Sequence, residues 1–126
     1  MSRAYLVDAH TLLWAADQSD LLSETARSIL NQPDNLSFVS SATLWELAIK
    51  CNVGKLVLPD DFFETVQAAG YQILPILPSH LEAYRRLPLH HRDPFDRILV
   101  AQALIEDLIV LSADSAFNDY QVRIAW

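Results

Sequence analysis

The residues of this sequence most able to do chemistry are four acids that lie far apart along the chain. Asp8 and Asp114 follow short apolar runs, whereas Glu46 and Asp96 lie in segments with the apolar spacing of packed helices. If these carboxylates converge, their mutual repulsion raises their pKa values unless cations intervene. Oxygen-only ligands suit Mg²⁺ or Mn²⁺, which also bridge to phosphate. The set therefore predicts metal-assisted hydrolysis of a phosphodiester bond.

Three of the four acids also have a purely structural explanation, whereas such an explanation is weaker for Glu46 because its helix face is apolar. Asp93 can act as a helix N-cap, Pro94 suits the first helical position, and Asp96 can complete a capping box. Asp8 can be a turn residue after a strand, and Asp114 can cap a short turn. Against this, the helix that follows Asp96 is apolar on the side of that residue, where a lone buried carboxylate is costly. We therefore favour the metal site for the four acids and a cap for Asp93.

Apolar runs alternate with helical patterns along the chain, and this order predicts the elements that position the acids. We expect strands at residues 5–7, 36–39, 71–77 and 108–111, with a possible edge strand at 122–126. We expect helices at 10–17, from 23 onward, and at 42–50, 62–69, 80–87 and 94–106, with a turn at 114–117. Such alternation indicates an α/β fold with a mainly parallel sheet covered on both faces. In these sheets ligands bind beyond the carboxyl ends of the strands, where Asp8 and Asp114 fall.

Size and composition narrow the class of protein. A chain of 126 residues predicts a single domain over residues 1–126, and its two glycines exclude glycine-rich phosphate loops. The single cysteine, Cys51, cannot form an internal disulfide and fits a reducing cytosol. The first ten residues lack the apolar core of a signal peptide, and no run of about 20 apolar residues could span a membrane. We therefore expect a cytoplasmic protein.

The charge balance limits the partners. A net charge of −7 opposes nucleic-acid binding, so a nucleic-acid function would need local charge reversal by a metal ion or a cluster of basic residues. Arg92 and Arg97 flank the acidic helix start and could bind phosphate or pair with a nearby acid. The histidines and Cys51 do not have the spacing of a zinc site. Aromatic residues are candidates for the core or for an apolar groove that holds a partner helix, namely Trp14, Phe62 and Phe63.

Several stretches, taken in order, resemble the motifs of the PIN-domain ribonucleases, in particular VapC-type toxins of bacterial toxin–antitoxin pairs. They are VDAHTLLW, SSATLWELAIK, HHRDPFDRILVAQA, and LSADSAF followed by Tyr120, Val122 and Trp126. The resemblance covers nearly the whole chain and implies a three-layer α/β/α PIN-like fold. It also implies an endoribonuclease that depends on Mg²⁺ or Mn²⁺ and hydrolyses RNA phosphodiester bonds. The family's catalytic and metal-binding acids fall on Asp8, Glu46, Asp96 and Asp114.

The same resemblance implies partners and one departure. A cognate antitoxin is expected to inhibit the enzyme by laying a segment across the site, and a homodimer is expected. Many members carry a hydroxyl next to the first aspartate, where this chain has Ala9. Thr11 or Ser112 could orient water instead. His90 and His91 are expected in a loop, near the RNA.

Other functions fit the residues less well. A phosphoacceptor receiver domain needs a pair of acids after the first strand and a late lysine, but this chain has VDAH and no lysine beyond Lys55. A phosphatase of the DxDxT type is excluded because His10 stands where its second aspartate belongs. A catalytically silent PIN-like binding domain remains the alternative, although none of the four acids is missing.

Overall fold

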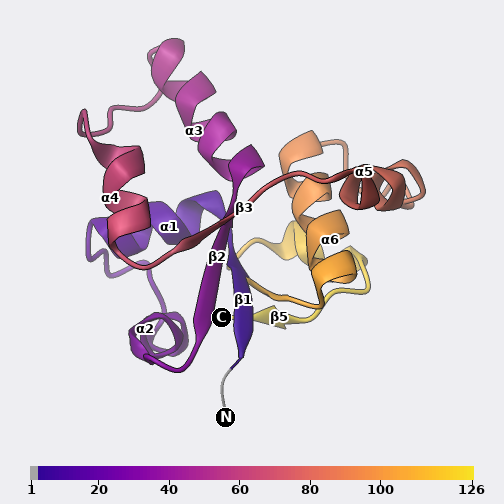
Figure 1. The fold of residues 1–126 in the computed structure, drawn as a ribbon, viewed down its shortest axis with the longest axis horizontal. Coiled ribbons are helices and arrows are strands. Elements are labelled where there is room, and N and C mark those ends of the chain that lie inside the picture. Colours follow the sequence, from indigo (N-terminus) through magenta and orange to yellow (C-terminus); the bar gives the residue numbers. More distant parts are fainter. Residues whose placement is uncertain (1–2) are drawn as a thin grey trace.

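The fold is built on five parallel strands whose order in the sheet is β3-β2-β1-β4-β5 (Figure 1). The computed structural model describes residues 3–126. The strands are β1 Ala4–Val7, β2 Leu36–Ser40, β3 Gln72–Leu74, β4 Ile109–Leu111 and β5 Ile124–Ala125. Each neighbouring pair in this sheet is parallel. The predicted parallel α/β architecture is therefore confirmed.

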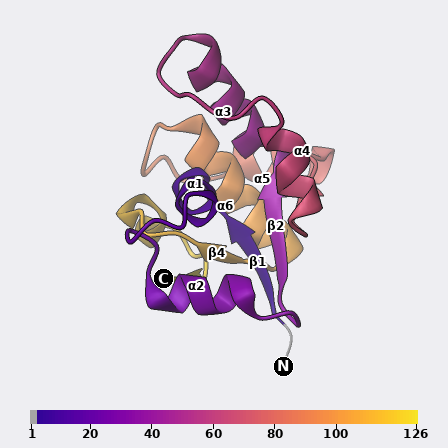
Figure 2. The same ribbon diagram turned by 90° about the vertical axis from the view of Figure 1, so that its left-hand side faces the viewer.

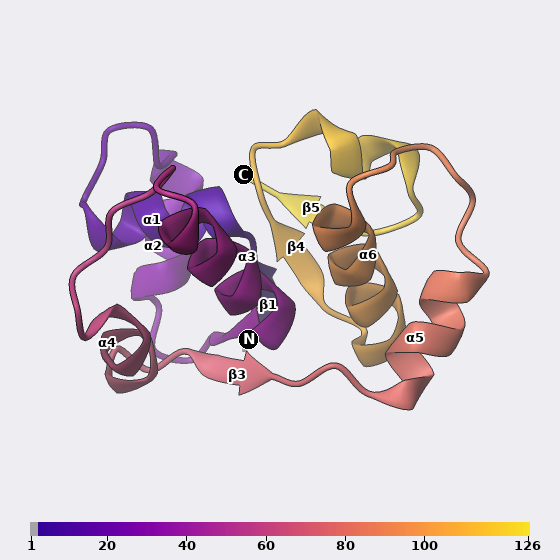
Figure 3. The same cartoon turned by 90° about the horizontal axis from the view of Figure 1, so that it is seen from above.

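Helices cover both faces of the sheet, which gives three layers (Figures 2 and 3). On one side lie α1 (Ala9–Ala16), α2 (Glu24–Asn31) and α4 (Phe62–Ala68), and on the other lie α5 (Pro78–Arg85) and α6 (Pro94–Glu106). Helix α3 (Ser41–Asn52) packs against both α1 and α6. The predicted turn at 114–117 is a short 3₁₀ helix, η1 (Ser115–Asp119). Within residues 3–126, no helix is both long enough and apolar enough to cross a bilayer.

Alternate side chains of the central strands fill two hydrophobic cores. Tyr5 and Val7 of β1 join one core, whereas Leu6 joins the core on the opposite face. In β4, Leu111 belongs to the first core and Val110 to the second. Both faces of these strands are therefore buried, as expected for a parallel sheet. This double burial fixes the register, and with it the edge at which the strands end.

The structure differs from the sequence-based expectations at particular residues. The third strand covers only 72–74 instead of 71–77, because Pro75 and Pro78 cannot donate to a strand ladder. Phe62 is buried as expected, but Phe63 is 38% exposed and lies outside the core. Cys51 is half-buried.

Candidate functional site

The sheet places two of the predicted acids at the point where the chain order reverses. Strands β2 and β3 extend the sheet on one side of β1, and β4 and β5 extend it on the other. Asp8 follows β1 directly, and Asp114 begins η1 shortly after β4. A reversal between neighbouring parallel strands opens a crevice beyond their carboxyl ends, where α/β proteins bind ligands.

All four predicted acids line one cavity of about 120 Å³ at this edge. Asp8 comes from the end of β1, Glu46 from α3, Asp96 from the first turn of α6, and Asp114 from the start of η1. The other lining residues are Ala9, His10, Lys50, Asp93 and Leu99. The cavity therefore collects five acids and one lysine.

Asp8 is held rigidly by its neighbours. It is 7% exposed and caps α1, with Oδ1 accepting a hydrogen bond from the Thr11 backbone N–H at 2.9 Å. Its Oδ2 accepts a hydrogen bond from the Ser112 hydroxyl. The predicted turn role of Asp8 is thus real, and it coexists with a place in the acidic cavity.

Ala9 has no hydroxyl, but the Ser112 hydroxyl lies against the Asp8 carboxylate. Ser112 is 2% exposed, donates to Asp8, and accepts a hydrogen bond from the Asp114 backbone N–H at 2.9 Å. Ser112 thereby connects the first and the last acid of the set. The Thr11 hydroxyl donates instead to the Leu111 carbonyl at 3.1 Å, so it supports the backbone and not the carboxylates.

Asp96 is the acid with the most perturbed titration. Its pKa is raised to about 7, mainly by burial. The negative charges of four neighbouring acids add to this shift, namely Asp93, Asp114, Glu46 and Asp8. Asp93 caps α6 by accepting from the backbone N–H groups of Phe95 at 2.8 Å and of Asp96 at 3.4 Å. The Asp96 carboxylate completes no capping box, and no described residue gives it a hydrogen bond or an ion pair. Helix capping therefore does not explain why Asp96 lines the cavity.

Glu46 and Asp114 are each held by one contact. Glu46 forms an ion pair with Lys50, one turn further along α3, with 3.4 Å between Oε2 and Nζ. Asp114 is exposed and caps η1, its Oδ1 accepting from the Ala116 N–H at 2.9 Å. Both contacts leave a second carboxylate oxygen without a protein partner among the described residues.

The donor chemistry of the cavity suits a hard divalent cation, but the side chains do not enclose one in this arrangement. Within residues 3–126, no three Asp, Glu, His or Cys side chains are placed to hold a metal ion together. Carboxylate oxygens are the ligands that Mg²⁺ and Mn²⁺ prefer. Burial, and after it the charges of the neighbouring acids, raise the pKa of Asp96, and a cation in the cavity would relieve the repulsive part.

Arg97 has a different role from the one that the sequence suggested. It is 7% exposed, and its Nη1 donates to the Pro88 carbonyl at 2.9 Å and to the Tyr120 hydroxyl at 3.1 Å. Its guanidinium lies over the Tyr84 ring, 5.0 Å from the centroid. Arg97 therefore fixes the loop before α6 and is not available to bind phosphate. His91, which lies in that loop, contacts Asp119 of η1, with 2.8 Å between Nε2 and Oδ2.

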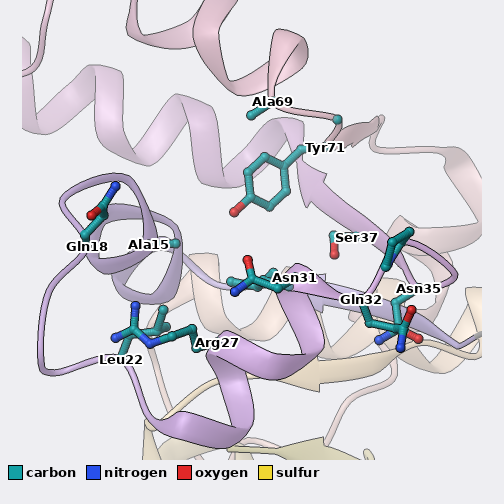
Figure 4. Close-up of a pocket in the computed structure, with 13 residues that line it drawn as sticks. Ala15, Gln18, Leu22, Arg27, Asn31, Gln32, Asn35, Ser37, Ala69 and Tyr71 are labelled. Carbon is teal, nitrogen blue, oxygen red and sulfur yellow. The ribbon is translucent and has the colours of Figure 1, made fainter.

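Two larger cavities lie on the side of α1, α2 and α4. One, of about 610 Å³, lies beside the start of β2, with Tyr71, Asn31 and Arg27 around it and no acid among its lining residues (Figure 4). The other, of about 480 Å³, is an apolar groove between α1 and α4. Phe62 lines this groove as expected, but Trp14 does not, because its ring lies between those of His10 and Trp126. Neither cavity contains any of the four acids.

Solved structures of known proteins share the fold of this chain. VapBC2 from Rickettsia felis, solved with a DNA fragment from its promoter, has a TM-score of 0.74 at 14% identity over 97% of both chains. A DNA-bound VapBC from Salmonella typhimurium has a TM-score of 0.71 at 17% identity, over 98% of this chain and 97% of that one. A toxin–antitoxin complex from Klebsiella pneumoniae has a TM-score of 0.67 at 16% identity, over 97% and 96%. At these identities the likeness shows a common fold.

No curated protein sequence matches the chain. A sequence model of the PIN domain family, however, matches residues 5–122, which is nearly the entire length. Together with the five-stranded parallel sheet and its acidic edge, this match shows that the chain belongs to the PIN domain family.

Proposed function

We propose that the protein is an endoribonuclease that depends on Mg²⁺ or Mn²⁺ and acts as the VapC-type toxin of a toxin–antitoxin pair. The observation that carries the proposal is the convergence of Asp8, Glu46, Asp96 and Asp114 on one cavity, where burial and mutual repulsion raise the pKa of Asp96 to about 7. Such repulsion costs stability and has no structural benefit in the fold. A site for a phosphodiester and a cation accounts for it.

In this proposal the four acids hold the cation, which would supply the positive charge that an acidic protein needs at a scissile phosphate. Ser112 keeps Asp8 and the start of η1 in register through its two hydrogen bonds. Asp93 begins α6 and so presents Asp96 to the cavity. Lys50 neutralises part of the charge of Glu46 and could contact a phosphate oxygen when a cation takes its place.

The proposed protein partner is an antitoxin whose apolar segment lies in the groove between α1 and α4. The groove is lined by Leu13, Leu58 and Phe62, and Asp17 and Asp61 stand among its lining residues. An apolar segment with basic residues would complement both features. Solved structures of similar fold include a toxin–antitoxin complex and a DNA-bound VapBC. Co-purification from the native operon should recover the partner, and a toxic protein that is always free of one would contradict this part of the proposal.

The proposed homodimer would use a second apolar surface, between α3, α5 and α6. Trp45 is 61% exposed and Leu81 is 54% exposed, and both border an apolar cavity of about 260 Å³. None of the residues that line this cavity is charged, so two copies of net charge −7 can meet there with little repulsion. Light scattering should show a dimer that Trp45→Glu converts to a monomer. A wild-type monomer at high concentration would contradict it.

The function is tested by cleavage of single-stranded RNA with purified protein. We expect cleavage with Mn²⁺ and none with EDTA, and we expect Asp96→Asn to lower the rate at least about 100-fold, because it removes one charge from the cation site with little change in volume. Asp20→Asn is the matched control, since Asp20 is exposed and lies outside the cavity. Undiminished cleavage by folded Asp96→Asn would refute the site. A folded wild-type protein that binds RNA without cutting it would favour the silent binding domain.

A further inference from the structure

One aromatic residue is among those that line the acidic cavity. His10 lines it together with Asp8, and the residue is exposed. Its ring lies nearly parallel to that of Trp14, with 5.6 Å between centroids and 12° between planes. Trp14 in turn packs against the hydrophobic core and against Trp126, with 5.7 Å between the centroids of the two rings. The imidazole is therefore a flat surface with a rigid support at the mouth of an acidic cavity.

This orientation is not the one that electrostatics alone would favour. An exposed imidazole beside carboxylates would gain most by turning a ring nitrogen toward one of them. No hydrogen bond joins His10 to another described residue, and it is the ring face that is in contact, on Trp14. The spacing of four residues along α1 puts the two rings on the same side of the helix. The face of His10 away from Trp14 is thus left for a ligand.

The chemistry of the cavity indicates which ligand this is. Its one lysine, Lys50, already pairs with Glu46, and the protein as a whole is acidic, so phosphate groups find little attraction outside the cation site. Stacking of a base on an aromatic ring does not depend on such charge and contributes roughly 5- to 150-fold in affinity. A phosphodiester at the acids carries a nucleoside on either side, within reach of the cavity wall.

We propose that His10, supported by Trp14, is the stacking platform for the nucleobase next to the scissile phosphodiester. The inference rests on the proposed ribonuclease function and adds to it a subsite that selects single-stranded RNA, whose bases are free to stack. His10 is thus a binding residue, and it transfers no proton in the reaction.

The test first maps the cut that the wild type makes with Mn²⁺ in a pool of random-sequence single-stranded RNA. The preferred oligonucleotide is then made in full and with an abasic nucleotide on either side of the cut. Three variants are compared: His10→Phe keeps a flat ring without nitrogens, His10→Leu keeps apolar bulk without a flat ring, and Phe63→Ala removes an exposed ring outside the cavity. Thermal melts establish that each variant is folded, and His10→Gln replaces His10→Leu if the latter is not.

We expect His10→Leu to lower kcat/KM on the full RNA roughly 5- to 150-fold, mainly through KM, with His10→Phe and Phe63→Ala close to the wild type. On the RNA that lacks the stacked base, the wild type and His10→Leu should be equal. An equal penalty for His10→Leu on the full RNA and both abasic RNAs overturns the platform. Loss of kcat in both His10 variants assigns the ring nitrogens to catalysis and also overturns it. A wild type that cuts no RNA refutes the proposed function itself, which is a separate result.

Discussion

At the scale of single residues, the surroundings of Asp96 determine how stability depends on pH. Burial, together with the charges of Asp93, Asp114, Glu46 and Asp8, raises its pKa to about 7, whereas an aspartate in an unfolded chain titrates near about 3.9. Between these values the folded protein binds a proton that the unfolded chain does not. The contribution of Asp96 to the free energy of unfolding therefore falls as the pH rises from about 4 to 7.

Asp96→Asn should remove this part of the pH dependence, because the amide carries no charge at any of these pH values. Urea denaturation in EDTA at several pH values between 4 and 8 measures it, with Asp20→Asn as a control that keeps the wild-type slope. Near pH 7.5 the Asn variant should be more stable than the wild type, and near pH 4 the two should be alike. Parallel profiles for all three proteins would show that Asp96 is not perturbed.

Ser112 gives a second prediction at this scale. Ser112→Ala leaves Oδ2 of Asp8 and the Asp114 N–H without the hydroxyl that each contacts, although Oδ1 of Asp8 keeps the Thr11 N–H. It should therefore lower the free energy of unfolding by about 1–3 kcal/mol. Thr11→Val removes a hydroxyl that bonds only to the Leu111 carbonyl, and it should cost about 1 kcal/mol. In cleavage assays Ser112→Ala should also be the less active of the two. Equal activities would remove Ser112 from the site.

At the scale of elements, Asp93 has two separable roles. It caps α6, and among the neighbouring acids it has the largest electrostatic effect on the pKa of Asp96. Asp93→Ser keeps a capping oxygen and removes the charge, whereas Asp93→Ala removes both. We expect both variants to lower the pKa of Asp96, measured by carboxyl NMR titration, and only Asp93→Ala to lose about 1 kcal/mol of stability. If Asp93→Ser leaves that pKa unchanged, Asp93 makes no contribution, and burial with the charges of the other three acids explains the shift.

Elements are also the scale at which the sequence was most informative. Apolar periodicity located the helices, and Asp93, which we expected as a cap, caps α6. The structure shows that Ser23 and Ser40 likewise cap α2 and α3. The length of β3 was overestimated, since an apolar run does not show where prolines end a ladder. The parallel order of the strands let us predict that Asp8 and Asp114 share an edge.

What the sequence could not show is how the side chains pair across that edge. The link between Ser112 and Asp8 joins residues 104 positions apart, so only the folded chain reveals it. The burial of Arg97 escaped notice because an arginine beside two aspartates has the same local pattern whether it faces solvent or a loop carbonyl. The contact between His10 and Trp14 has helical spacing and could have been noticed, but its position beside the acids depends on the sheet.

At the scale of the whole molecule, the net charge is −7 and several acids are crowded at one cavity. We therefore expect the folded protein to bind divalent cations better than the unfolded chain, where the same acids are far apart. A ligand that binds only the folded state stabilises it by RT ln(1 + [L]/Kd), about 2.7 kcal/mol at a hundred times Kd. Mn²⁺ should therefore raise the melting temperature of the wild type above its value in EDTA, in the absence of any RNA.

The variants separate a specific site from general screening of charge. Asp96→Asn should lose most of the increase that Mn²⁺ produces, whereas Asp20→Asn, which lowers the net charge equally, should keep it. Sodium chloride at matched ionic strength screens all surface charges alike and should stabilise the three proteins by similar amounts. If Mn²⁺ shifts Asp96→Asn as far as the wild type, the ion binds elsewhere on the acidic surface, and the cavity is not a cation site.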